Sequence, residues 1–503
     1  MRLRTTSQLK IGAVLTYISI GFTIIVGAFY TPWMIEQIGK SDYGLYTLAN
    51  SIISLFLVDF GLSSATSRFV AKYRAEKREQ EIPGFIGMVY KLYLIIDAVV
   101  LAALLIMYLC LDRLYVNLLP AELCKLKVVF CMAGCYSVIS FPCVTFNGIL
   151  NAYEKFAPLK FADFVQRIGT VVLTSLALLM GYKLYALVVV HAISGLISIA
   201  IKAVYVSRCT TVRFVRSDYT QIKEVFRFSL WSFVYALAQR LIFNITPTIL
   251  GVSVAAASSA IAVFGIITTI EGYAFTITTA ISGMFLSRVT HIIQDDEEGK
   301  KITDLAIQVG RFQFALNGLI LVGFFLVGKE FINLWVGPDY QDAYLGIVLI
   351  IFPQVFYNAL QIANTTILAR NLIRYQAYVQ IIMGLCNVVL SVVLSRIWGA
   401  IGASVSICIA YSLRTILTLV LVKRKINFDL GRFAKQCFMK MSIPLGVAML
   451  ICWPILKQMS SGGWVALALK ILIVVLVQLV SVIVLGLSND EKKCLLRRIS
   501  IHK

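Results

Sequence analysis

The sequence predicts an all-α integral membrane protein with about 14 transmembrane helices, arranged as two pseudo-symmetric six-helix lobes around a central cavity and followed by two additional C-terminal helices. The composition excludes an ordinary soluble domain, because 59% of the 503 residues are hydrophobic and only 14% are charged. Apolar runs of ~20 residues, long enough to cross a bilayer, recur along the whole chain. Short motifs of the first half also return in the second half, which is typical of transporters built from two similar helical bundles.

The predicted transmembrane segments follow one another with short connections, and their boundaries are approximate. The first is too long for a signal-peptide core and lacks a small-residue cleavage site, so we interpret it as a helix. In chain order the fourteen segments lie near residues 11–35, 44–67, 84–110, 126–150, 161–181, 184–206, 225–250, 256–285, 306–328, 343–367, 374–396, 400–422, 439–457 and 464–487.

Basic residues gather in alternate connections between these segments. They cluster at residues 68–78, 208–227 and 423–435 and again in the tail at 492–498, whereas the intervening loops hold few. Because basic loops stay on the cytoplasmic side, both termini are expected in the cytoplasm. The net charge of +21 then reflects topology and attraction to anionic lipid headgroups, and no nucleic-acid partner is predicted.

An internal repeat divides the chain. Four short motifs recur in the same order ~215 residues later: Thr31-Pro32 as Thr246-Pro247, Phe141-Pro142 as Phe352-Pro353, Asn147 as Asn358, and Thr170–Thr174 as Asn387–Ser391. Each copy holds an even number of helices, so both copies cross the membrane with the same polarity, related by an axis along the membrane normal.

The repeat sets the predicted domains: an N-terminal lobe (1–206), a linker with a C-terminal lobe (207–422), and an additional helix pair with a cytoplasmic tail (423–503). The additional pair either widens a lateral groove for a lipid tail or simply packs against a lobe. The sequence leaves these two alternatives open.

The connecting loops argue against an enzyme or a transport ATPase. None is long enough for a catalytic domain, and the sequence holds no P-loop, no metal-ligand cluster and no convincing Ser/His/Asp set. Most of the 11 cysteines lie inside apolar segments without a CxxC pair, as small buried thiols do. We therefore predict no metal and no cofactor, and expect transport to be driven by an ion gradient, the substrate gradient or a partner.

Two stretches around the second segment carry a family resemblance. Gly39-Lys40-Ser41-Asp42-Tyr43-Gly44-Leu45-Tyr46 opens it, and Asp59-Phe60-Gly61-Leu62 with Arg68 closes it. Together they resemble the N-terminal signature of the polysaccharide-biosynthesis flippases of the Wzx type, within the multidrug/oligosaccharidyl-lipid/polysaccharide exporter superfamily. The second lobe departs from this pattern, because Arg288 aligns with Arg68 but no acid aligns with Asp59.

The resemblance implies a function. A protein of this family would turn an undecaprenyl-pyrophosphate-linked oligosaccharide from the cytoplasmic to the outer leaflet of a bacterial inner membrane by alternating access, for surface polysaccharide (O-antigen, capsule or exopolysaccharide) biosynthesis. Its partners would be the lipid-linked glycan and membrane lipids, with glycan polymerase and chain-length proteins as further candidates. The alternatives are a multidrug or cation exporter of the same superfamily and a peptidoglycan-precursor flippase.

Arg240 is the sharpest candidate for substrate binding. A charged side chain inside a transmembrane segment costs ~2.5 kcal/mol or more, so it normally faces a wet cavity or a partner. Arg240 lies near the middle of its segment, beside Gln239 and close to Asn244. A guanidinium can bind pyrophosphate oxygens in pairs, which suits this substrate. The alternative is a structural ion pair with an acid such as Glu271.

Three further cations, Lys91, Arg167 and Arg311, lie nearer the inner ends of their segments. They either extend to lipid headgroups or line a basic vestibule that admits the pyrophosphate. Asp163 precedes Arg167 by one helical turn, so these two could also pair with each other. We expect Lys202 and Arg414 to extend to lipid headgroups.

Acidic side chains supply the remaining candidates. Asp97 and Glu271 lie near mid-depth by residue count, where a carboxyl group could exchange a proton during the transport cycle or form a structural ion pair. Asp59 lies closer to the cytoplasmic end, within possible reach of Arg68. We interpret Asp59, Arg68 and the equivalent Arg288 as a gate or helix clamp.

Overall fold

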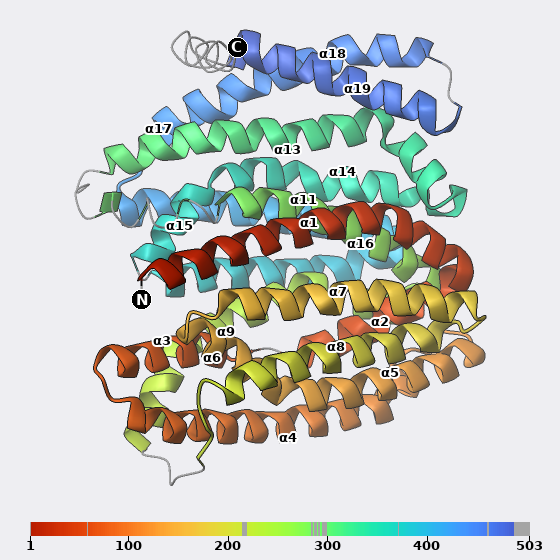
Figure 1. The fold of residues 1–503 in the computed structure, drawn as a ribbon. Coiled ribbons are helices and arrows are strands. Elements are labelled where there is room, and N and C mark those ends of the chain that lie inside the picture. Colours follow the sequence, from red (N-terminus) through yellow and green to blue (C-terminus); the bar gives the residue numbers. More distant parts are fainter. Residues whose placement is uncertain are drawn as a thin grey trace. The chain divides into compact units, whose positions relative to one another are not determined.

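The computed structural model describes residues 2–57, 59–213, 219–282, 285, 289, 292–293, 299–370, 372–459 and 462–486, and the regular structure in these ranges is helical throughout (Figure 1). Many helices present large apolar side chains on their surfaces. Leu109, Leu450 and Val465 are 74%, 76% and 75% exposed. Such surfaces are stable against lipid and unstable against water. The chain is therefore an all-α multi-pass membrane protein, as the composition predicts.

The described residues contain 12 helices long and apolar enough to span a membrane, compared with the fourteen segments that the sequence predicts. One difference lies at the second predicted segment. It is split into α2 (Lys40–Phe56) and α3 (Leu62–Ala75), each too short to qualify alone. Gly61, with φ 71°, starts α3 in the left-handed region that glycine tolerates.

The other difference lies at α16 (Ile373–Ile426), a run of 54 residues. As one straight helix it would extend roughly 80 Å, more than twice the ~30 Å hydrocarbon core. Gly399, with φ 55° and ψ −130°, interrupts the helical conformation inside it. The predicted segments 374–396 and 400–422 lie on either side of this residue, so the kink separates what the sequence predicts as two crossings.

The chain forms two compact units. The first holds residues 1–265 together with 388–399 of α16. Within it α1 packs on α7, α7 on α8, α2 on α5, and α3 on α6, and Figure 1 shows α7 beside α8. Besides α2 and α3, its elements are α1 (Arg2–Ile38), η1 (Glu79–Glu81), α4 (Ile82–Leu114), α5 (Pro120–Ser140), η2 (Phe141–Val144), α6 (Thr145–Ala152), α7 (Phe156–Leu179), α8 (Leu184–Ser207), α9 (Tyr219–Phe243), α10 (Ile245–Ser253) and the start of α11 (Ala257–Ser282).

The second unit holds residues 266–387 and 400–503. Its centre is α13 (Lys300–Trp335), which packs on α14 and also on α18 and α19. The other elements are η4 (Pro338–Tyr340), α14 (Asp342–Ala359), α15 (Gln361–Ala369), α17 (Leu430–Phe433), the π-helical turn η5 (Ala434–Met439), α18 (Lys440–Gln458), α19 (Gly463–Ser481) and the π-helical turn η6 (Val482–Gly486).

Gly399→Ala tests the kink in α16. The backbone there is one that L side chains rarely adopt, and an added Cβ would meet only Val254 at 4.0 Å, so the cost is strain rather than collision. We expect a loss of about 1–3 kcal/mol of stability, measured as a lower Tm in detergent. The matched control is Gly446→Ala in α18, where the Cβ has open space and alanine should stabilise the helix by about 1 kcal/mol. An unchanged Tm for Gly399→Ala would contradict the strained kink.

Candidate functional site

Asp59 occupies the break between α2 and α3. Its Oδ1 accepts a hydrogen bond of 2.8 Å from the Tyr93 hydroxyl on α4, and the backbone N–H groups of Leu62 and Ser63 also point to this carboxylate. Asp59 thus accepts hydrogen bonds from backbone N–H groups in the first turn of α3, which have no partner inside the helix, and it connects this turn to α4. The next residue, Phe60, stacks on Phe233 of α9 with ring centroids 4.1 Å apart. These contacts favour the helix-clamp interpretation of Asp59, while its pairing with Arg68 stays a prediction. Arg288 lies outside the described residues.

Arg240 is half-buried near the end of α9. Its Nη1 donates to Asn244 Oδ1 at 3.5 Å, the outer limit of a hydrogen bond. Within the first unit, no described carboxylate forms an ion pair with this guanidinium. Among the described side chains of this unit, the Asn244 amide is the one that contacts the Arg240 guanidinium. The other N–H groups of the guanidinium can therefore donate hydrogen bonds to a bound anion.

Glu271 is buried in the second unit, on α11. Its Oε1 accepts a short hydrogen bond from Gln354 Nε2 of α14, and the charge of Arg414 acts on it as well. Glu271 thus has a hydrogen-bond partner and a compensating cation within its own unit.

Arg414 does not extend to lipid headgroups, so that expectation is wrong. The side chain is only 8% exposed, and its guanidinium lies 3.6 Å from the ring centroid of Tyr357 and 4.2 Å from that of Tyr411. The rings of Tyr357 and Tyr411 and the carboxylate of Glu271 stabilise the guanidinium at this buried position. The sequence of the segment that contains Arg414 does not reveal these partners. Among the described residues, Arg414 Nε has no hydrogen-bond partner.

A chain of buried amides and a hydroxyl joins α11, which carries Glu271, to α13 and α14. Asn317 Oδ1 accepts from Thr278 Oγ1 and from Asn358 Nδ2, each at 3.0 Å, and Gln313 Nε2 donates to the Thr278 carbonyl at 3.2 Å. Sequence reasoning did not select these residues. The one available signal was Asn358, which the repeat aligns with Asn147.

The inner-end cations of the first unit have varied surroundings. Arg167 is exposed and donates from Nη1 to Thr23 on α1. Asp163, its possible partner, instead pairs with Lys202 at 2.7 Å and Lys160 at 3.8 Å. Lys202 is therefore held by a carboxylate with 11% of its side chain exposed, and its expected extension to headgroups is wrong. Lys91 is half-buried on α4.

Arg311 connects α13 to the additional helices. Its Nε donates to the Gln436 carbonyl of η5 at 2.9 Å. A π-helical turn leaves carbonyls without their usual partner, so this contact stabilises the turn that leads into α18. In the first unit, Asp97 is 7% exposed, and no described residue forms a hydrogen bond with its Oδ1.

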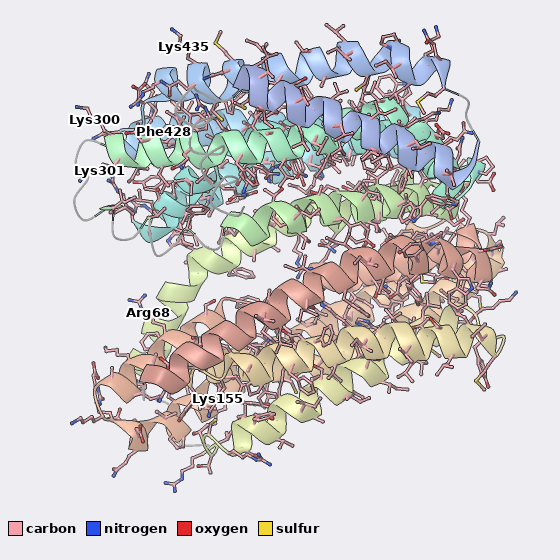
Figure 2. All side chains as sticks on the ribbon, turned by 45° about the horizontal axis from the view of Figure 1, so that its top comes forward. Arg68, Lys155, Lys300, Lys301, Phe428 and Lys435 are labelled. Carbon is pink, nitrogen blue, oxygen red and sulfur yellow. The ribbon has the colours of Figure 1, made fainter. Side chains whose placement is uncertain are left out.

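Basic side chains collect at one end of each unit. In Figure 2, Arg68 and Lys155 lie at the same end of the first unit, and Lys300, Lys301 and Lys435 lie at the same end of the second. These residues belong to the connections that the positive-inside rule places in the cytoplasm. The basic vestibule of Lys91, Arg167 and Arg311 stays a prediction.

An apolar groove of about 260 Å³ runs between α13 and α19. Close to its α19 wall, Lys470 forms a 2.7 Å ion pair with Glu330 of α13, and only 6% of the lysine side chain is exposed. The additional helix pair therefore packs against α13 and also forms a groove with it. The lining residues are Leu319, Ile320, Gly323, Phe324, Val327, Gly328, Phe331, Ile471, Val474 and Val475.

Comparison with known proteins assigns the family. Residues 10–293, more than half of the chain, match the family described as polysaccharide biosynthesis protein. The chain belongs to this family. Comparison with curated protein sequences gives no match.

Solved structures identify the fold. The lipid II flippase MurJ, in an inward closed conformation, is similar with TM-score 0.67 and 15% identity over 95% of this chain and 98% of that one. An inward-facing multidrug resistance MATE family transporter of the MOP superfamily has TM-score 0.62 and 15% identity over 84% and 98%. The Vibrio cholerae MATE transporter VcmN has TM-score 0.57 and 12% identity over 84% and 98%. The chain thus has the fold of MOP-superfamily transporters.

A double-mutant cycle tests the buried charges of the second unit. Arg414→Gln leaves the Glu271 carboxylate without its cation, so we expect a loss of about 3–5 kcal/mol, seen as a lower Tm or poor recovery in detergent. Glu271→Gln added to Arg414→Gln should restore part of that loss. Lys160→Ala, which removes an exposed ion-pair partner, should change stability by less than about 1 kcal/mol. Additive losses in the double variant would contradict the coupling of Arg414 to Glu271.

Proposed function

We propose that this protein is a flippase that moves an undecaprenyl-pyrophosphate-linked oligosaccharide from the cytoplasmic to the outer leaflet of a bacterial inner membrane, for surface polysaccharide biosynthesis. The observation that carries the proposal is the family match over residues 10–293. The multi-pass fold of the chain supports transport rather than glycan synthesis. Surface glycans that are assembled on a membrane lipid must cross the bilayer. Alternating access and two cytoplasmic termini belong to the same proposal.

The extent of the structural likeness favours a lipid-linked substrate. The lipid II flippase aligns with 95% of this chain, whereas the two MATE transporters align with 84%. The MATE comparisons leave roughly 80 residues of this chain without a counterpart. The segment 423–503, which carries α18 and α19, has about the same length. The fuller coverage by the lipid II flippase supports the flippase over a multidrug or cation exporter.

The groove between α13 and α19 suits the lipid tail. Apolar side chains and glycines line it, and one wall belongs to the additional pair. Because the tail comes from the hydrocarbon of the bilayer and not from water, van der Waals packing against this wall would hold it there. We assign the groove to part of the polyprenyl chain. The glycan requires a hydrated path through the protein, whereas the polyprenyl chain does not. A lateral groove would keep the chain outside that hydrated path.

Arg240 suits the pyrophosphate. In the first unit its charge meets no described carboxylate partner, unlike that of Lys202, which pairs with Asp163. Lys91, Arg167 and Arg311 are assigned to the basic route by which the headgroup enters. Glu271 and Asp97 are the candidates for proton coupling, Glu271 because Gln354 and Arg414 hold it in a buried network, and Asp97 because it is a buried carboxylate. Glycan polymerase and chain-length proteins are candidate partners.

A peptidoglycan-precursor flippase is the second candidate, and the likeness to the lipid II flippase favours it. Reconstitution separates the candidates. Proteoliposomes loaded with a short-chain glycan-pyrophosphate-polyprenol would be read with a membrane-impermeant lectin, with and without a pH gradient. Parallel vesicles would carry lipid II. We expect lectin signal above protein-free vesicles and none above background for lipid II. Movement of lipid II alone, or export of small cations without glycan signal, would overturn the proposal.

Arg240→Ala should abolish flipping in this assay while expression and membrane insertion stay normal, and Arg240→Lys should retain part of the rate. The reason is that lysine keeps the charge but loses the paired geometry of a guanidinium. Arg78→Ala is the matched control, because Arg78 is exposed and pairs with Glu76 and Glu81. Full activity of Arg240→Ala would end its assignment to the pyrophosphate.

Gly323→Leu should block the groove without disturbing the fold. An added Cβ at Gly323 meets no heavy atom within 4 Å, because this residue faces the open groove. We expect the apparent affinity for the lipid-linked glycan to fall about tenfold, equivalent to ~1.4 kcal/mol, at unchanged Tm. Gly446→Leu, in equally open space on α18 but outside the groove, is the control. Equal affinities for both variants would remove the tail from this groove.

A further inference from the structure

The stretch Gly39–Tyr46 carries the family resemblance, but the proposed binding residues do not explain it. In the structure it forms the start of α2. The starts of α5 and α11 meet it there. All of α2 and the first turns of α3 separate this place from Arg68, so it lies toward the side that the distribution of basic loops predicts to be outside.

A single carboxylate joins the three helices. Glu122 Oε1 on α5 accepts from the hydroxyl of Ser41 on α2 at 2.5 Å and from that of Ser258 on α11 at 2.7 Å. Its Oε2 accepts from the backbone N–H of Leu119 at 3.1 Å, which fixes the carboxylate at the first turn of α5. Beside it, Lys125 of α5 pairs with the buried Asp42 of α2 at 2.6 Å.

Gly44 brings α2 and α11 into backbone contact. A Cβ at this position would lie 2.0 Å from the carbonyl oxygen of Ser258 and 2.8 Å from its carbonyl carbon. Because the obstacle is backbone, no side-chain rotation could relieve it, and glycine is the residue that allows the approach. The second glycine of the stretch is therefore a contact surface for α11.

Residues in the connection between α4 and α5 also contact α10. Asn117 Nδ2, in the connection between α4 and α5, donates to the Val252 carbonyl at 2.6 Å. At Gly251 a Cβ would lie 2.6 Å from the ring of Tyr115. The repeat aligns Thr31-Pro32 of α1 with Thr246-Pro247 of α10. The contacts thus join helices of the first repeat copy to α10 and α11, which begin the second copy.

We propose that Ser41, Gly44, Glu122 and Ser258 form a latch that holds the start of α11 on α2 and α5 and closes the outer side of the transport path. The inference rests on the proposed function and names the gate of that function. Hydroxyl-to-carboxylate hydrogen bonds exchange readily with water once exposed, so the contact can open and close repeatedly. The start of α11, up to Gly265, belongs to the first compact unit and the rest to the second, so the latch acts on the segment by which this helix passes from one unit to the other.

Accessibility tests the latch without any substrate. Ala257, the first residue of α11, is fully buried and takes no part in the latch hydrogen bonds. Ala257→Cys, with the exposed Cys124 replaced by alanine, is labelled with a membrane-impermeant maleimide. A latch keeps the open state below about 10%, so Glu122→Ala should raise the labelling rate about tenfold. Glu122→Gln, which keeps one acceptor oxygen, should fall between. The exposed Ala255→Cys should label equally fast in every background.

A cross-link tests the role in transport. The Ser41 and Ser258 hydroxyls reach the same carboxylate oxygen, so cysteines at both positions can come within disulfide range. In the reconstituted protein we expect oxidation of Ser41→Cys/Ser258→Cys to stop glycan flipping and reductant to restore it, while each single variant is indifferent to oxidant.

Three results distinguish the failures. Unchanged labelling of the Ala257→Cys variant after Glu122→Ala overturns the latch whatever the substrate. Undiminished flipping by the cross-linked protein shows that this contact need not open, and also overturns it. Absence of glycan flipping by the unmodified protein overturns the proposed function, and the labelling experiment then still decides the latch.

Discussion

The rest of the structure depends on one constraint: a polar or charged side chain in the apolar interior is costly unless it finds a partner inside the protein. Asp59 is held by Tyr93, Lys202 by Asp163, and Lys470 by Glu330. Each contact ties one helix or helix break to another, so the same polar groups that are costly in a membrane also determine which helices pack together. The hydrophobic surface sets the protein in the bilayer, but these contacts specify the arrangement.

The same constraint separates structural cations from candidate binding cations. Lys202, Arg240 and Arg414 look alike in sequence, each being a lone cation in an apolar segment. In the structure Lys202 meets a carboxylate and Arg414 meets two tyrosine rings, while Arg240 meets the Asn244 amide at 3.5 Å. A cation that a permanent carboxylate neutralises has little to offer a pyrophosphate. Arg240 is therefore the stronger candidate for a charge that the substrate completes.

Sequence predicts the fold class here because apolar length is a direct consequence of bilayer thickness. Hydropathy does not register a short local change of backbone direction inside an apolar segment. The break between α2 and α3 lies inside one predicted segment, 44–67, whereas Gly399 lies between two predicted segments, 374–396 and 400–422. For the candidate site, sequence finds that a charge is present, but the partner comes from a distant helix. Glu271 with Gln354, and Ser41 with Glu122, are about 80 residues apart.

The order of contacts along α13 links these themes. Arg311, Gln313 and Asn317 make polar contacts near the middle of this helix, and the apolar groove begins at Leu319, only two residues later. With the predicted orientation, the polar stretch lies toward the cytoplasm and the groove toward the outer side. A lipid of the inner leaflet has the same order, with its headgroup at the cytoplasmic surface and its chain toward mid-bilayer. Gln313 and Asn317 are buried, so the half-buried Arg311 is the residue of this stretch that we assign to the headgroup. α13 would then contact both the headgroup and the chain of a lipid-linked substrate, which a small soluble drug could not do.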